Sequence, residues 1–323
     1  MPATFFHAYH GENVYNLLSD EVKDKINLDR MKTFAQGTDP MMFYNLISIF
    51  PGKSIRKYQK ICHNTKTRDF FIELINNIKC NNYDKDSFSF LCGYICHYVL
   101  DSTFHPYVIY KSGQFNKNDK ETFKYNGKHA MMEAFLDNYI IESFLNLNSN
   151  TFRVDKYALY TKRFSNNLNV LLNNSFKNVY NFENMDKYYY KAICQMKRDI
   201  YLGRYDSIGF KRCIYKLVDF ITPKYFFCFE SVSYYQKVSK EVSDSYLNVS
   251  KKIWHYPSDY NKKSNKNFDE LYNSALNEAK RLIEISYKYI NGENIDLNKY
   301  FTNKSFLTGI DCNIKKKIKY FEY

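Results

Sequence analysis

The strongest constraint on this chain is a run of metal-ligand side chains spaced four residues apart. In the segment GYICHYVLDSTFHPY, His97, Asp101 and His105 stand at positions i, i+4 and i+8. On a helix this spacing places the first two side chains on one face, where they can chelate a metal ion. With seven histidines and 34 carboxylates in 323 residues, chance would produce the pattern only about 0.016 times. It therefore predicts a helix that carries a metal site.

Pro106 follows this pattern directly. Proline lacks a backbone N–H and restricts the residue before it, so we expect the helix to end near Phe104. His105 would then turn from the end of the helix toward a neighbouring metal ion.

Four further residues are candidate ligands. His129 and Glu133 are also four residues apart, but about 0.7 such pairs are expected by chance, and an isolated pair is an ordinary hydrogen bond on a helix surface. Taken together with the motif of His97, Asp101 and His105, this pair becomes a candidate second part of the metal site. Asp39, in the loop sequence GTDP, could supply another oxygen ligand, although aspartate is common in turns. His63 by itself would be an ordinary polar histidine.

Periodicity and composition predict an all-α fold, with residues 1–323 forming a single compact helical domain. Apolar residues recur every three or four positions in segments that we predict to be helices: 14–26, 69–78, 88–100, 131–144, 187–200, 210–220 and 268–290. Loops are predicted at 37–40, 51–52, 81–84, 111–120 and 257–267, while residues 293–323 receive no assignment. Asn267, or Ser264 further back, could cap the last long helix, and Gly292 falls at its expected end.

Composition narrows the class of protein further. The chain is 45% apolar, which excludes collagen-like and disordered chains, and its 10 glycines and 6 prolines are too few for a many-stranded sheet protein. No glycine pattern of a P-loop or of a dinucleotide-binding site is present, which argues against a nucleotide cofactor. The net charge of +13 suits nucleic acid, an anionic membrane surface or a small anionic substrate, or it reflects lysines on a solvated face.

The sequence also predicts in which compartment of the cell the protein resides. Residues 1–11 lack a basic segment followed by an apolar run, and no stretch reaches the roughly 18 apolar residues of a spanning helix. We therefore expect a soluble, cytoplasmic protein with no transmembrane segment. The eight cysteines are then expected to be reduced thiols rather than a disulfide framework.

Together these residues resemble the zinc-dependent phospholipase C family, whose fold and metal centre are shared with the single-strand-specific zinc nucleases. The resemblance extends to the N-terminal block MPATFFHAYHG, to the run CHYVLDSTFHPY and to a SFLTGID stretch at 305–311. It implies an all-α domain with two or three zinc ions at the base of a cleft. Imidazole and carboxylate groups suit zinc.

The resemblance also implies a ligand set for each ion. The matching ligands of one zinc ion are Asp39, His63, His97 and Asp101, the last placed to bridge to a second ion. The matching ligands of another are His105, His129 and Glu133. His7 matches a ligand of the third ion, which the processed N-terminal residue completes in secreted members. This chain begins Met1-Pro2, so we expect the Pro2 amine to chelate there after removal of Met1.

The function implied is a zinc-dependent, phospholipase C-like phosphodiester hydrolase, with Asp39 also acting as general base. Its substrate would be a phospholipid or another anionic phosphodiester. Nothing after residue 250 resembles the lipid-binding β-sandwich of some toxin members, because 268–290 is predicted to be helical. Two alternatives stay open: a nuclease that takes single-stranded nucleic acid as its substrate, and a helical protein that acts on a cytosolic biosynthetic intermediate.

Overall fold

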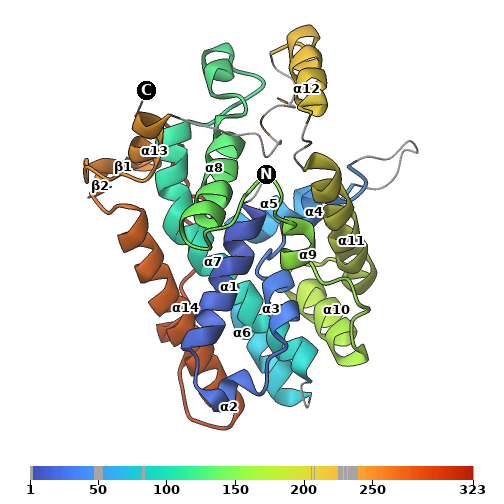
Figure 1. Cartoon of the computed structure of the whole chain (residues 1–323). Helices are drawn as coiled ribbons and strands as arrows, with labels where there is room; N and C mark the ends of the chain where they lie inside the picture. The colour runs from blue at the N-terminus through green and yellow to red at the C-terminus, as the bar shows by residue number, and fades with distance from the viewer. Residues whose placement is uncertain are drawn as a thin grey trace.

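The chain folds into packed α-helices with one small antiparallel hairpin (Figure 1). The computed structural model describes residues 3–46, 54–81, 84–204, 206, 208–224, 228, 231 and 239–322. The helices are α1 (Thr4–Leu17), α2 (Asp20–Lys23), α3 (Leu28–Phe34), α4 (Pro40–Phe43), α5 (Arg56–Asn64), α6 (Thr67–Cys80), α7 (Lys85–Ser112), η1 (Lys120–Tyr125), α8 (Lys128–Ser143), α9 (Val154–Ala158), α10 (Asn166–Tyr180), α11 (Met185–Gly203), α12 (Phe210–Ile221), α13 (Lys240–Tyr246), α14 (Phe268–Ile290) and η3 (Leu297–Lys299). The strands are β1 (Trp254–Tyr256) and β2 (Asp259–Ser264). The all-α prediction is confirmed.

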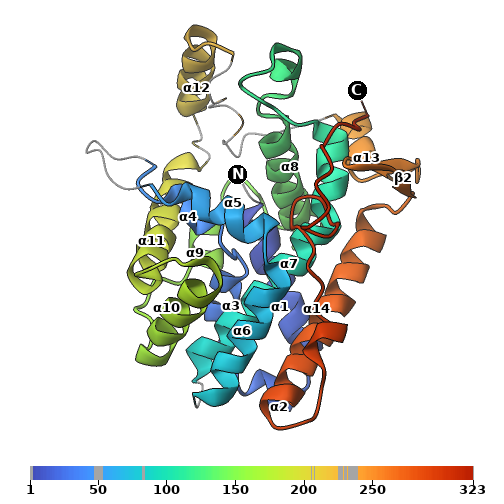
Figure 2. The same cartoon turned by 180° about the vertical axis from the view of Figure 1, so that it is seen from behind.

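Helix α7 is the central element. It packs against helices α1, α3, α6, α8, α10 and α14 and against strand β1, and Figure 2 shows it in the middle of the molecule. Asp84 caps its N-terminus by accepting a hydrogen bond from Ser87 N at 2.9 Å. Because α7 is covered on several sides, most of its side chains are buried, among them the thiols of Cys92 and Cys96. All eight cysteines lie in the described part of the chain, and all are free thiols.

The prediction that Pro106 ends this helix is wrong. Helix α7 continues through Pro106 to Ser112. Proline removes one helical hydrogen bond, a cost that tertiary packing can offset. Here the last turns are held by burial, since the Tyr107 ring contacts Trp254 and its hydroxyl donates to Ser245 O at 2.9 Å. His97, Asp101 and His105 therefore share one uninterrupted helix.

Other predicted boundaries vary in accuracy. The predictions at 69–78, 88–100, 187–200 and 210–220 lie within α6, α7, α11 and α12, the prediction at 131–144 overlaps α8, and that at 268–290 coincides with α14. A capping box formed by Asn267 and Glu270 begins α14, and Gly292, at φ +99°, follows its end, as predicted. The predicted helix 14–26 is wrong, because Leu18 is extended and separates α1 from α2. The predicted loop 257–267 contains β2, and the predicted loop 51–52 lies outside the described residues.

The C-terminal segment, which received no assignment, packs against the helices. Phe301 is fully buried, with its ring stacked on that of Phe71 at 4.9 Å between centroids. Further along, Phe306 N donates to His63 O at 2.9 Å. This contact holds the segment around Phe306 against α5, and the 3.1 Å approach of Phe306 O to His105 Nδ1 brings it to α7 as well.

Among the described helices we find no candidate for a transmembrane span.

We expect Gly93→Ala to destabilise the fold by about 1–3 kcal/mol, because it overpacks the crossing of α7 and α3. A Cβ at Gly93 would lie 2.6 Å from Met31 O and 2.7 Å from Phe34 Cβ. The matched control is Gly11→Ala on α1. Its Cβ would lie 3.3 Å from the Cβ of Ala35, the residue that follows α3. Denaturant unfolding of both variants measures the difference, and equal midpoints would contradict the packing argument.

Candidate metal centre

All eight predicted ligands lie around the middle of α7. His7 comes from α1, Asp39 from the turn before α4, and His63 from the end of α5. The others lie on two helices: His97, Asp101 and His105 on α7, and His129 and Glu133 at the start of α8. Two groups of these residues have ligand atoms close enough together to hold a metal ion: His7, Asp39, His97 and Asp101, and His105, His129 and Glu133.

The first group is completely enclosed. Asp101 contacts histidines from two helices, with Oδ1 3.2 Å from His7 Nε2 and Oδ2 3.4 Å from His97 Nε2. His63 adjoins this group, since its Nε2 is 3.2 Å from His97 Nε2 and 3.5 Å from Asp39 Oδ1. Five potential ligands thus surround one small buried volume.

The second group is more open. Glu133 Oε1 lies 3.0 Å from His129 Nε2 and 3.4 Å from His105 Nε2. The His129 side chain is 33% exposed, whereas Asp101 is buried. His105 Nδ1 is 3.5 Å from Asp101 Oδ2, so this carboxylate contacts both groups. The predicted bridging position of Asp101 is consistent with this geometry.

Backbone carbonyls fix the orientation of two of the rings. His97 Nδ1 lies 3.1 Å from Ala35 O, and His105 Nδ1 lies 3.1 Å from Phe306 O. A carbonyl oxygen can only accept, so each Nδ1 donates its hydrogen, and in the neutral ring Nε2 is then the nitrogen with a lone pair for a metal ion. The sequence motifs did not identify either carbonyl as a partner, since a backbone atom leaves no signal of residue type.

Two other neighbours escaped prediction. Gln59, one turn before His63 on α5, donates from Nε2 to Asp39 Oδ1 at 2.9 Å and lies 3.0 Å from His63 Nδ1. Gly37, at φ +52°, packs flat against His97, because a Cβ there would be 2.0 Å from His97 Cδ2. The spacing of Gln59 and His63 by four residues is the one sequence signal that could have linked Gln59 to the site.

Burial and charge oppose each other in this centre. Burial lowers the pKa of His63 to about 3 and that of His97 well below its usual value. Burial and the neighbouring Asp101 charge raise the pKa of Asp39 to about 7. Burial opposes ionisation of Asp101 and His105 too, but their mutual attraction, with help from their other neighbours, lowers the pKa of Asp101 and raises that of His105 to about 10.

These residues fit zinc. Within the described part of the chain, Asp101 Oδ2 is buried without a hydrogen bond, although nitrogens of His97 and His105 lie near it. A buried carboxylate oxygen in this state is costly unless a cation satisfies it. Imidazole and carboxylate donors around it are the set that zinc prefers. The predicted Pro2 ligand lies outside the described residues.

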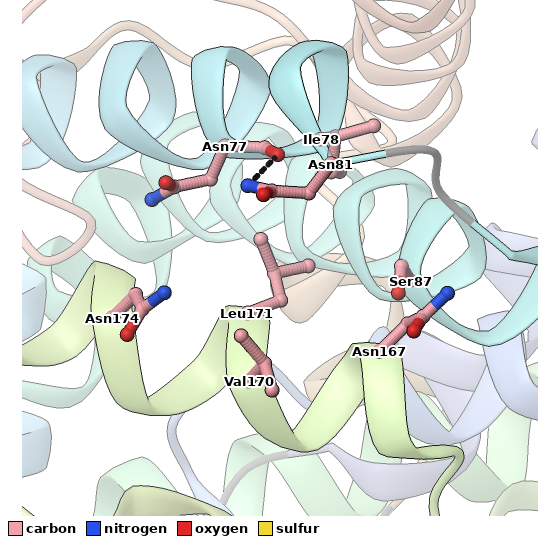
Figure 3. Close-up of a pocket in the computed structure, with 8 residues that line it drawn as sticks. All are labelled: Asn77, Ile78, Asn81, Ser87, Asn167, Val170, Leu171 and Asn174. Atoms are coloured by element: carbon pink, nitrogen blue, oxygen red, sulfur yellow. Dashed lines mark hydrogen bonds between the residues drawn. The ribbon is translucent and has the colours of Figure 1, made fainter.

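A pocket elsewhere is unrelated to this centre. A cavity of about 180 Å³ lies where α6 and α10 face each other, and four of its eight lining residues are asparagines. Figure 3 shows the side chains that line it. None of the eight predicted ligands lines it.

Comparison with known proteins adds one match. The model of a family described as zinc dependent phospholipase C matches residues 6–202, a stretch that contains all eight predicted ligands. No curated protein and no solved structure matches the chain.

His97→Ala should lose bound zinc, because it removes a nitrogen ligand from the enclosed group. The loss of zinc affinity should exceed the roughly 10–100-fold that removal of an outer-shell partner costs. Zinc per chain after dialysis, measured by atomic absorption, tests this. His255→Ala is the control, since His255 lies on β1 with its ring stacked on Tyr260. Full zinc content in His97→Ala would show that His97 is not a ligand.

Zinc binding should release protons and should strengthen as pH rises. The pKa of His105 is about 10 without metal, so this ring is protonated at neutral pH and must lose its proton to bind zinc. Below that pKa, affinity should rise about ten-fold per pH unit for each proton displaced. Zinc titration in weakly buffered solution at several pH values measures both effects, and an affinity independent of pH would contradict the expectation.

Proposed function

The chain belongs to the zinc-dependent phospholipase C family, and from this we propose that it hydrolyses phosphodiesters, with phospholipids as substrates, on the glycerol side of the phosphate. The observation that carries the proposal is the pairing of two ligand groups through Asp101, whose Oδ2 is 3.4 Å from His97 Nε2 and 3.5 Å from His105 Nδ1. Adjacent metal sites suit an in-line displacement at phosphorus, where both the attacking and the leaving oxygen need stabilisation.

The family and the geometry support a centre of two or three zinc ions. One ion would be held by His63 together with Asp39, His97 and Asp101 of the enclosed group, and a second by His105, His129 and Glu133 of the open group. His7, which belongs to the enclosed group and lies 3.2 Å from Asp101 Oδ1, would serve a third ion. When bound, zinc supplies Lewis acidity, which acidifies water and stabilises charge on a phosphoryl group.

We assign Asp39 the additional role of general base. The Gln59 amide donates to Asp39 Oδ1 and so fixes the carboxylate, whose Oδ2 lies 4.0 Å from His97 Nε2. A carboxylate beside metal cations keeps its charge, so Asp39 could orient the attacking water and accept its proton. Gln59 acts only by positioning Asp39, and we do not count it among the catalytic residues.

Among the described residues, the aromatic rings that contact the enclosed histidines do not form a stacking platform for bases. A nuclease for single strands needs aromatic faces on which bases can stack. The aromatic side chains whose rings contact the enclosed histidines, Phe306 and Tyr94, are buried and pack against the metal ligands. These two rings therefore belong to the packed core and are not available to stack on nucleic-acid bases.

The test is phosphorus NMR of the zinc-loaded protein with short-chain phosphatidylcholine and a single-stranded oligonucleotide in one tube. We expect phosphocholine to appear, and Asp39→Asn to slow its appearance by about 100-fold or more. Asp29→Asn, which removes the same charge from an exposed position on α3, is the control and should keep the rate.

Other products would contradict the proposal. Nucleoside monophosphates alone would identify a nuclease. If zinc is bound but neither substrate changes, both activities fail, and a small cytosolic phosphodiester becomes the substrate to seek.

A further inference from the structure

Helix α12 has an apolar face that the rest of the described chain leaves uncovered. No residue of its twelve is buried. Phe210, Ile214, Leu217 and Ile221 recur at three- and four-residue spacing and form one stripe. All are exposed, Leu217 by 62%, and the neighbouring Phe220 is 87% exposed. A globular chain rarely presents such a stripe to water, and when it does the stripe marks a binding surface.

The rest of the surface of α12 is mainly basic. Arg212 and Lys216 lie on the side away from the stripe, with a single carboxylate, Asp219. Lys211 flanks the stripe, and its Nζ donates to Leu202 O at 2.8 Å. A short helix with an apolar face and a cationic face is the form that lies flat in the headgroup layer of a membrane. The positive charge complements anionic lipid, in line with the net charge of +13 for the whole chain.

The position of α12 links it to the metal centre. Three residues beyond the helix, Lys224 O accepts a hydrogen bond from Asn126 Nδ2 at 3.0 Å. Gly127, which precedes α8, has Ser231 and Cys228 within about 3 Å of its Cβ position. His129, the most exposed of the predicted ligands, follows two residues later. Figure 1 shows α12 rising from this end of the molecule, near the beginning of α8.

We infer that α12 docks the protein on the surface of an anionic phospholipid bilayer, with its apolar face in the headgroup layer. This inference rests on the proposed phospholipid substrate, which such docking would bring to the open side of the metal centre. The helix lies beyond residues 6–202, so the family match does not account for it. A bilayer fits the element better than a second copy of this chain, because the headgroup layer matches both the apolar stripe and the basic side chains, whereas a copy docked through the stripe would cover the apolar side chains only.

The test is flotation of the zinc-loaded full chain with phosphatidylcholine vesicles that contain or lack phosphatidylglycerol. We expect binding to the anionic vesicles. Leu217→Gln should weaken it about ten-fold or more, because a leucine loses its burial in lipid. Val170→Gln on α10 is the matched control, since Val170 is also an exposed helical side chain, at 53%. Lys216→Gln should weaken binding about five-fold and reduce its dependence on salt.

Hydrolysis separates this inference from the proposed function. With a dispersed short-chain phospholipid, Leu217→Gln should keep the wild-type rate, while its rate on vesicles should fall with its binding. If the wild type hydrolyses neither form yet floats through α12, the proposed function fails and the docking surface stands.

The inference is overturned if the wild type does not float, or if wild type and Leu217→Gln float equally. In the second case, sedimentation velocity decides what the stripe does. A change from dimer to monomer in Leu217→Gln would make the stripe a contact between copies. Because no residue of α12 is buried, the thermal midpoint of the variant should equal that of the wild type.

Discussion

The carboxylate of Asp101 is the contact on which the rest of the metal centre depends. It is buried in the middle of α7, and nitrogens of four histidines approach it: His7 at 3.2 Å, His97 at 3.4 Å, His105 at 3.5 Å and His63 at 3.9 Å. These rings come from three helices that are distant in sequence. A buried charge is tolerated only when it is surrounded by partners of opposite charge or by a cation. Helix α7 itself supplies two of these histidines, and α1 and α5 supply the others.

Close packing makes this gathering of polar groups possible. Gly93 lets α3 cross α7 near contact distance, which brings the Ala35 carbonyl to His97. Gly37 lies against the same His97 ring. The segment around Phe306 packs against His105, whose Nδ1 is 3.1 Å from Phe306 O. Each contact fixes a ring orientation that the metal chemistry needs, so the packing of the core and the geometry of the centre cannot be separated.

The molecule combines an enclosed centre with an exposed element at its open side. Burial around Asp101 excludes water and strengthens electrostatic interactions, while the His129 side chain in the second group is 33% exposed. Helix α12 lies near the beginning of α8, which carries His129 (Figure 1), and it differs from the core helices because its apolar side chains are exposed. A large, partly insoluble substrate would require both features, whereas a small soluble one would require only the first.

The sequence alone determined the features that depend on local spacing. The four-residue intervals on α7 and α8 predicted five candidate ligands, and the N-cap of α14 was predicted at Asn267. The resemblance to a known family added His7, Asp39 and His63, which no local pattern singles out. Only the tertiary structure decided the rest, because those features depend on contacts between distant segments. The packing of Tyr107 on Trp254 carries α7 through Pro106, and the backbone carbonyls of Ala35 and Phe306 orient the rings. Periodicity predicted a helix at 210–220, but whether its apolar face points inward or outward depends on what packs against it, which no local pattern records.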